Sequence, residues 1–448
     1  MPESLYFFIM LFSFIFFAAI KIPISVSLMF SALCGAIASG HFFPLRHLVE
    51  GSFGYLDAIL IIASAMIFME SIKASGLLED FAVRITHRFK RNPLFLLIIM
   101  TLFIMSAGMI TGSSSAAVLT TGAIAFPVLK DLGLNKKKAG ALIAMSAIFG
   151  MIAPPINIPA MLIGQGVDMP FIGFTAPLLF LTFPLAIITA LMIGVKEVKA
   201  IDDTTLKNPE PFGTKWMLYL PIVIFIALMI LENTSSVSLG LPLVFMLCAL
   251  IATLTSRENF IKVSVKALKE SINILSILIG VGMFIQIMTL NGTRGVIVDF
   301  LNGLPDIILI LGIAFGIPLF GAVSSYGSAS VLGVPFLLAF LGNNDIMVCA
   351  SLSLLAGLGD MVPPTALAGI FAAHVVGEKN YFNVWLRALP SFFLTMLFGT
   401  LTLYYSKYFA GIVNSNLFYP VFFAIIILFA IVLIVIDKKR YSLRGDSV

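Results

Sequence analysis

The chain has 448 residues, of which 60% are hydrophobic and only 11% charged, with a formal net charge of +5. This composition excludes an ordinary soluble globular protein. The apolar segments are continuous rather than alternating, which excludes a transmembrane β-barrel. We therefore expect an all-α polytopic membrane protein. Its Lys and Arg residues lie in loops and set the orientation in the membrane lipid, so binding to nucleic acid is not expected.

Apolar segments that approach or reach the ~20 residues needed to cross a bilayer recur along the chain. The first of them lacks a basic lead and a small-residue cleavage site, so we expect a retained helix rather than a signal peptide. The expected crossings are 4–20, 24–41, 55–72, 139–167, 171–194, 216–232, 237–255, 271–290, 344–376, 384–410 and 417–436.

Two further apolar regions, 93–130 and 305–341, are each interrupted by a serine-glycine cluster. The clusters are Thr111–Ser115 and Ser324–Ser330. Such runs are poor lipid-facing helix, and irregular backbone at membrane depth is tolerated only inside protein or beside water. We predict that each region is a re-entrant helical hairpin with the cluster at its tip.

Two of the expected crossings contain a Pro-Pro pair with a similar lead-in. Gly150–Pro155 is one copy and Gly359–Pro364 is the other, 209 positions later (359 minus 150). Proline lacks an N–H and disfavours helical geometry in the residue before it. Both helices are therefore predicted to break, at 153–157 and at 362–365.

Basic loops at 84–91 and 130–138 flank the first hairpin, so this hairpin is expected to open to the cytoplasm. Counting crossings places 291–294 outside, and the second hairpin then opens outward. The two halves thus form a predicted inverted-topology repeat, as in secondary transporters. The expected parts are an N-terminal helix (1–23), repeat 1 (24–195), a cytoplasmic linker with a connecting helix (196–236), inverted repeat 2 (237–410), and an extra C-terminal helix with a basic cytoplasmic tail (411–448).

A broken helix frees backbone groups that can hold ions. Carbonyls before the break can ligate a small hard cation such as Na⁺, and N–H groups after it attract an anion. The cation candidates, mostly through backbone carbonyls, are Gly112, Ser113, Gly150, Pro154, Ser324, Gly359, Asp360 and Pro363. The substrate candidates are Ser114, Ser115, Asn157, Ser325, Ser328 and Thr365. No catalytic residue and no organic cofactor are expected.

Asp360 is the acid that we place deep in a membrane segment, directly before the second break; the 209-residue offset puts Met151 at its counterpart. Buried ionisable residues in membranes are functional candidates. Asp360 could ligate a cation, carry a proton or cap the following half-helix. Asn157 is either its functional partner or an N-cap. Glu70 and Asp57 are expected at helix ends near the interface.

Several of these segments resemble the large membrane subunit of tripartite ATP-independent periplasmic (TRAP) transporters, within the ion transporter superfamily. They are the early turn Lys21–Ile24, the hairpin tip Ser106–Ala116, the broken helix Ala139–Pro155, the second break Gly357–Pro364, and Pro335 at the end of the second hairpin. The resemblance implies Na⁺-driven, elevator-type uptake of a small organic acid in a bacterial or archaeal inner membrane. It also implies a small four-helix membrane subunit and a periplasmic substrate-binding protein as partners.

The chain departs from the family pattern at several places. Ala117 stands where the family usually has an acid, Ser325-Tyr326 replaces a typical Asp-Pro, and the helix 417–436 follows the usual end. The alternative is therefore a self-sufficient Na⁺- or H⁺-coupled carboxylate symporter of the same superfamily. An intramembrane enzyme has little support, because the sequence shows no metal-ligand spacing and no Ser–His pair within the expected crossings. A channel has little support, because no rings of pore charges are found.

Overall fold

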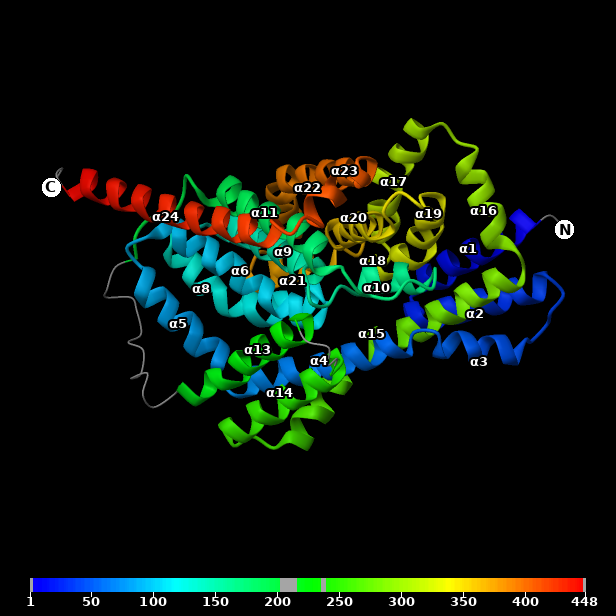
Figure 1. Cartoon of the computed structure of the whole chain (residues 1–448), viewed down its shortest axis with the longest axis horizontal. Coiled ribbons are helices and arrows are strands. Elements are labelled where there is room, and N and C mark those ends of the chain that lie inside the picture. The colour runs from blue at the N-terminus through cyan, green and yellow to red at the C-terminus, as the bar shows by residue number, and fades with distance from the viewer. Residues whose placement is uncertain (1–2, 202–215, 235–238, 446–448) are drawn as a thin grey trace.

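The structure is a computed structural model that describes residues 3–201, 216–234 and 239–445, with side chains described up to Asp437. Within these ranges the regular elements are all helical, as the composition predicts. Much of the expected linker 196–236 and the basic side chains of the C-terminal tail lie outside the described residues. Figure 1 shows an elongated bundle in which many helices run close to its long axis.

The first part of the chain forms five helices, α1 to α5. Helices α3 and α4 meet at a bend of 44° and together are long enough to be one broken span. The predicted basic loop at 84–91 falls largely on α5. That helix forms because Leu78, Ala82 and Thr86 recur every four residues and are buried, which leaves its charged residues on the other face. The bounds are α1 Glu3–Ala19, α2 Ile24–Ala38, α3 Leu45–Phe53, α4 Leu56–Ala74 and α5 Leu77–Phe89.

A helical hairpin and an interrupted helix follow. The hairpin consists of α6 (Pro93–Thr111), α7 (Ser114–Ala117), the π-helix η1 (Val118–Gly122) and α8 (Ala123–Asp131). The hydroxyl of Thr121 on the return arm donates to the carbonyl of Ile104 on the first arm. The interrupted helix consists of α9 (Lys136–Ile152) and α10 (Ile158–Gln165), and α11 (Thr175–Gly194) completes this part.

The same order of elements recurs in the second half. Its hairpin consists of α17 (Asp306–Gly321), α18 (Ser325–Ser328), the π-helix η4 (Ala329–Gly333) and α19 (Val334–Ala339). Its interrupted helix consists of α20 (Asp345–Gly357), the 3₁₀ turn η5 (Leu358–Met361) and α21 (Leu367–Val376), followed by α22 (Tyr381–Tyr404). Both short tip helices have four residues and both π-helices have five.

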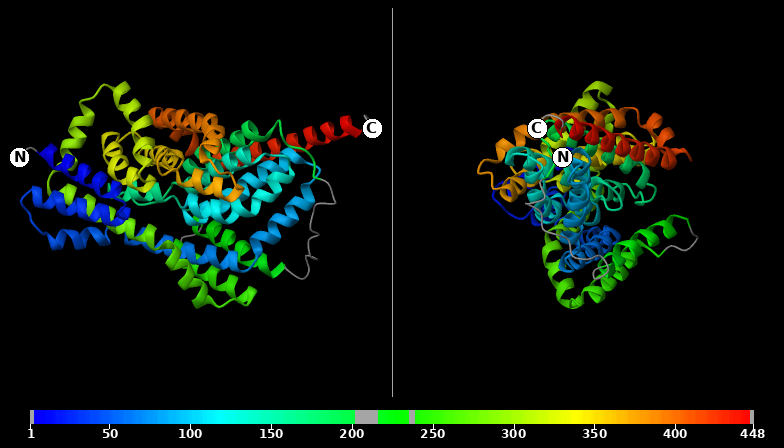
Figure 2. Two further views of the ribbon diagram at one scale, coloured as in Figure 1. Left: turned by 180° about the vertical axis from the view of Figure 1, so that it is seen from behind. Right: turned by 90° about the vertical axis from the view of Figure 1, so that its left-hand side faces the viewer.

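Between α11 and the second hairpin lie η3 (Trp216–Tyr219), α13 (Leu220–Thr234), α14 (Leu241–Ser256), α15 (Phe260–Leu290) and α16 (Thr293–Asn302). Helix α15 is one continuous helix of 31 residues, so it begins before the expected crossing 271–290. Figures 1 and 2 show α4, α14 and α15 along one side of the molecule, with the hairpins and interrupted helices on the other side. At the end, α23 (Ser406–Val413) leads into α24 (Phe418–Gly445).

Five described helices are long and apolar enough to cross a membrane, or six if α3 and α4 form one span. Shorter apolar helices account for several other expected crossings, among them α1, α2 and α14. The interrupted helix α9–α10 lies at the centre, because nearly every residue from Ala139 to Gly164 is buried. A helix that is apolar and buried on all sides belongs in the core of a large bundle.

Candidate functional site

The tip of the first hairpin is ordered by its own polar residues. Helix α6 ends at Gly112, whose φ of +64° is a left-handed conformation that glycine adopts without strain. Ser113 then caps α7, its hydroxyl accepting from the N–H of Ala116 at 3.3 Å. This geometry turns the hydroxyl of Ser114 toward the second half of the chain, where it donates to the carboxylate of Asp360.

Asp360 lies at the second break, and only 4% of its surface is exposed. It belongs to η5, the turn that precedes the second Pro-Pro pair. Ser325, from the tip of the second hairpin, also interacts with its carboxyl group. Hydroxyls from both hairpin tips therefore lie at one buried acid.

The two hairpin tips also contact each other directly. The phenol of Tyr326, in α18, donates to the carbonyl of Gly112 at 3.0 Å. Tyr326 was not among the site residues predicted from the sequence. Its position in a serine-glycine tip, one residue after Ser325, was the available signal, because a buried tyrosine needs a hydrogen-bond partner for its hydroxyl.

The two Pro-Pro breaks are each held against the preceding hairpin. The N–H of Ile156 donates to the carbonyl of Met109 at 3.3 Å. In the second half, Thr365 donates to the carbonyl of Ala322 from its N–H at 3.3 Å and from its hydroxyl at 2.6 Å. Ile156 and Thr365 are separated by 209 positions, the same offset as the Pro-Pro pairs (365 minus 156). Both pairs contain a cis peptide bond, Pro154-Pro155 and Pro363-Pro364.

Paired glycines bring each hairpin close to its broken helix. A Cβ on Gly108 would lie 2.7 Å from the backbone of Gly150, and a Cβ on Gly321 would lie 2.8 Å from the Cα of Gly359. The carbonyls of Gly150 and Gly359 accept from the N–H groups of residues 153 and 362. These two candidate cation residues thus have a packing role, and their carbonyls are already hydrogen-bonded.

Asn157 connects the first break to the second half. Its side-chain oxygen accepts from the N–H of Ala160 at 2.9 Å and so caps α10. Its amide nitrogen donates to the carbonyl of Ile152 and to the hydroxyl of Ser353, both at 2.9 Å. Asn157 is fully buried. The N-cap alternative from the sequence therefore describes its contacts; the sequence carried no signal for Ser353.

The remaining candidate site residues include some that make hydrogen bonds within their own hairpin and some for which the structure gives only their burial. Ser324 caps α18, and the hydroxyl of Ser328 donates to Ile317 within its own hairpin at 2.6 Å. Ser115 and Pro363 are half-buried, whereas Pro154 is buried. The structure brings together Ser114, Ser325 and Asp360, and next to them Gly112 with Tyr326.

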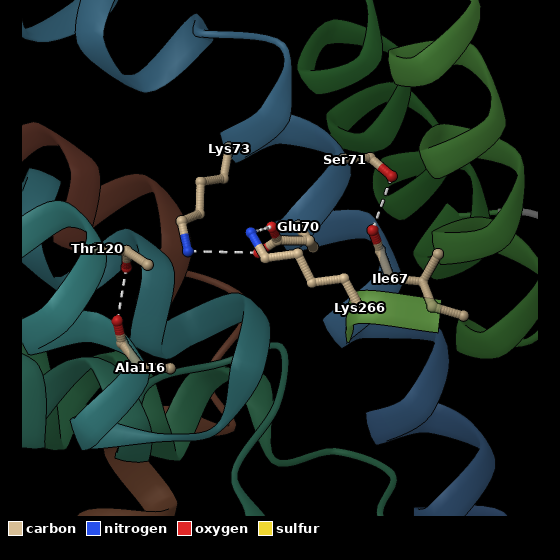
Figure 3. A network of polar contacts seen from close by, with 7 residues as sticks. All are labelled: Ile67, Glu70, Ser71, Lys73, Ala116, Thr120 and Lys266. Atoms are coloured by element: carbon tan, nitrogen blue, oxygen red, sulfur yellow. Dashed lines mark hydrogen bonds and ion pairs between the residues drawn. The ribbon is translucent and has the colours of Figure 1, made fainter. Parts of the chain in front are cut away.

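Glu70 lies one turn before the C-terminal end of α4, in keeping with the expected helix-end position, but its side chain is packed between helices. Only 6% of Glu70 is exposed. Figure 3 shows it between two lysines: Lys266 of α15 forms one ion pair, and Lys73 of α4 forms the other at 3.4 Å. A carboxylate buried among helices needs such partners, because an unpaired buried charge is costly. This network joins α4 to α15 and is separate from the site at Asp360.

The arrangement offers one carboxylate, several hydroxyls and the carbonyl and N–H groups at the ends of the broken helices. A single carboxylate with neutral oxygens suits a monovalent hard cation, and helix N-termini suit an anion. Helical membrane proteins with discontinuous helices that meet at a buried polar site form the class of secondary transporters.

Comparison with known families agrees with this class. Residues 11–409 match the family described as "Tripartite ATP-independent periplasmic transporter, DctM component". The chain belongs to this family, whose members are transporter components rather than enzymes, and it is the large membrane subunit type. The resemblance seen in the sequence is thereby confirmed.

A crystal structure of the YdaH transporter from Alcanivorax borkumensis, described as having an unusual topology, is similar in fold. The TM-score is 0.58 at 15% sequence identity, and the match covers 87% of this chain and 96% of the other. At this identity the likeness concerns the fold alone. No curated protein is a significant match to the chain.

Proposed function

We propose that this protein couples the inward movement of Na⁺ to the uptake of a small organic acid through the site at Asp360. The observation that carries the proposal is the convergence of both hairpin tips on this one acid, through Ser114 and Ser325. Cation binding at Asp360 would draw the two tips together, and the helix ends beside them would receive a carboxylate. Binding of the ion and binding of the substrate would thus depend on the same contacts, so that each would raise the affinity for the other.

The proposed moving unit comprises the two hairpins and the two interrupted helices. The bond between Tyr326 and Gly112 and the bond from Asn157 to Ser353 support this proposal, because they join both halves into one body. Helices α2, α4, α14 and α15 would form the scaffold. The inverted-topology repeat, with the C-terminus in the cytoplasm of a bacterial or archaeal inner membrane, belongs to this proposal.

Membership of the family implies two partners, a small four-helix membrane subunit and a periplasmic substrate-binding protein. A self-sufficient symporter is a second candidate, favoured by one observation. Helix α24 lies beyond the matched residues 11–409 and packs on α6, where a partner would otherwise have access. Co-expression of the chain with and without genes for such partners, followed by uptake measurements, separates the two.

The coupling is tested by uptake into proteoliposomes of the purified chain, with its partners where they are required. A mixture of labelled dicarboxylates is the probe. We expect uptake to need an inward Na⁺ gradient and Asp360→Asn to raise the Na⁺ concentration for half-maximal uptake. Uptake that follows a proton gradient and is indifferent to Na⁺ would refute Na⁺ coupling.

A further inference from the structure

An apolar groove of ≈ 980 Å³ runs between α11, α23 and α24. Its wall includes Phe183, Ile187, Gly411, Phe418, Phe422 and Ile425. One side of the groove is formed by α24, which lies outside the residues that match the family. In Figure 1 this helix crosses the outside of the bundle beside α11. The groove is within the size range of sites for small apolar ligands.

A second cavity of ≈ 350 Å³, called the polar cavity here because charged and hydroxyl side chains are among its lining, adjoins the groove, because Lys407 and Tyr408 line both. It also contains Asp306, from the first turn of α17, and Ser406. The hydroxyl of Ser406 donates to the carbonyl of Asn343 at 2.8 Å, which holds the start of α23 against the second hairpin. Among the described residues, neither Lys407 nor Asp306 forms an ion pair. One cavity thus presents one cation and one anion.

Three exposed tyrosines line the polar cavity, and a fourth lies at the start of α24. Tyr404, Tyr405, Tyr408 and Tyr419 all lie on α22 to α24 within 16 residues of each other (419 minus 404, counted inclusively) and are exposed. Tyrosine is enriched where a membrane protein meets the headgroup layer, since its ring is apolar and its hydroxyl polar. The polar cavity therefore lies at the headgroup level, and the groove extends from it along apolar helix.

We propose that this composite site binds one phospholipid with a zwitterionic amine headgroup. The acyl chains lie in the groove, the phosphate contacts Lys407 and the ammonium contacts Asp306. Each charge of the lipid headgroup then contacts a protein charge of opposite sign. The acyl chains pack against the aromatic side chains of the groove. A peptide or a second copy of the chain would not match this pattern of two opposite charges at the mouth of an apolar groove.

The bound lipid connects three separate parts of the chain. Asp306 starts the second hairpin, Lys407 belongs to α23, and Phe422 belongs to α24. The lipid thereby fixes the C-terminal helix to the body that carries Asp360. This inference does not require Na⁺ coupling or any particular substrate.

The test is lipid titration of the purified full chain in detergent, read by native mass spectrometry. Three dioleoyl lipids serve as probes: phosphatidylethanolamine, phosphatidylcholine and phosphatidylglycerol. We expect one phosphatidylethanolamine to bind most tightly. Phosphatidylcholine has no N–H to donate to Asp306, and phosphatidylglycerol has no cation. Asp306→Asn should remove the preference for phosphatidylethanolamine over phosphatidylglycerol.

Two substitutions test the two parts of the site. Lys407→Ala should weaken binding of every phospholipid roughly tenfold, the loss expected for one charge-assisted hydrogen bond. Gly411→Leu should also weaken it, because the new side chain takes up part of the space for the acyl chains in the groove. A Cβ at Gly411 meets no atom within 4 Å, so this substitution fills the groove without distorting the fold.

Matched controls are available on the same fold. Gly312→Leu, in α17, also adds a side chain where no atom lies within 4 Å, but it lines neither cavity. Lys379→Ala removes another exposed lysine outside both cavities. Both should bind lipid like the wild type. Equal binding of all three lipids, binding that ignores Gly411→Leu, or a protein dimer without lipid would each overturn the proposal.

Discussion

Asp360 receives its direct hydroxyl partner from the opposite half of the chain. Ser114 and Asp360 are 246 residues apart, and the bond between them is buried. Such a bond cannot form unless the first hairpin tip and the second break lie together. Ser114 therefore positions the carboxylate of Asp360.

Ser114→Ala is expected to raise the Na⁺ concentration for half-maximal uptake roughly tenfold, because a hydrogen bond to a charged group is lost. Uptake assays at varied Na⁺ measure this shift. Ser328→Ala is the matched control, since its hydroxyl bonds only within the second hairpin. An unchanged Na⁺ dependence for Ser114→Ala would remove this residue from the ion site.

The two lysines beside Glu70 are expected to compensate for each other as its ion-pair partners. Lys266→Ala alone should lower the unfolding free energy by about 1 kcal/mol, since Lys266 is largely exposed and Lys73 remains beside the carboxylate. Removing both lysines leaves the buried Glu70 unpaired. The double variant should therefore lose more than the sum of the single losses, by about 1 kcal/mol. Denaturation in detergent measures the unfolding free energies of the two single variants and the double variant, with Lys262→Ala as control. Losses that simply add would contradict a shared network.

At the scale of elements, helix α24 supplies a cap to a distant helix. Asn92 precedes α6 but makes no side-chain cap. Instead, the carboxylate of Asp437 accepts from the N–H of Leu94 at 3.0 Å and from that of Phe95 at 3.2 Å. Asp437 is 1% exposed. A carboxylate at a helix N-terminus satisfies free N–H groups and interacts favourably with the helix dipole.

Asp437→Ala is expected to destabilise the protein by about 1–2 kcal/mol, the usual cost of losing an N-cap. The loss should be local, so amide exchange should increase in the first turn of α6 and along α24. Hydrogen-exchange mass spectrometry of the full chain checks this. Asp437→Asn keeps an accepting oxygen and should recover part of the protection. Equal protection in all three proteins would show that packing alone holds α24.

Sequence reasoning locates the elements better than the contacts between them. The breaks follow from the Pro-Pro pairs, because two successive prolines inside a helix remove two hydrogen-bond donors and disfavour helical geometry in the residue before them. The hairpin arms follow from the apolar runs on both sides of a polar tip. The cap from Asp437 and the bond from Tyr326 to Gly112 depend on how helices pack, and no local pattern encodes that. Helix α5 was not predicted, because the charged residues on its exposed face were interpreted as a loop.

At the scale of the whole molecule, orientation in the membrane follows from loop charge and from the order of elements. Lys137 and Asn302 are both exposed and lie at opposite sides in the predicted topology. We expect a cysteine at 137 to react with an impermeant maleimide only from the cytoplasmic side, and one at 302 only from the outside. The background carries Cys34→Ser, because Cys248 and Cys349 are buried. Labelling of both from one side would contradict the inverted repeat.

Movement of the proposed unit must break its bonds to the parts of the chain outside it. Arg294 of α16 donates to the carbonyl of Gly166 at 2.6 Å, and Tyr55 donates to that of Leu162 at 3.0 Å. Both carbonyls lie at the end of α10, so both bonds stabilise the conformation seen here. Arg294→Ala removes one charged donor and should shift the population of states roughly tenfold away from this conformation.

Spin labels at Asn302 in α16 and at the exposed Ile172 after α10 would report this shift as a change in their distance distribution. Arg46→Ala is the control, because Arg46 is exposed and pairs only with Glu50 on its own helix. Asp360→Asn should alter the response of the distribution to Na⁺ without removing the second state. One unchanged distance in every variant, with and without Na⁺, would show that α10 does not move against α16, and the hairpins would then have to open on a fixed body.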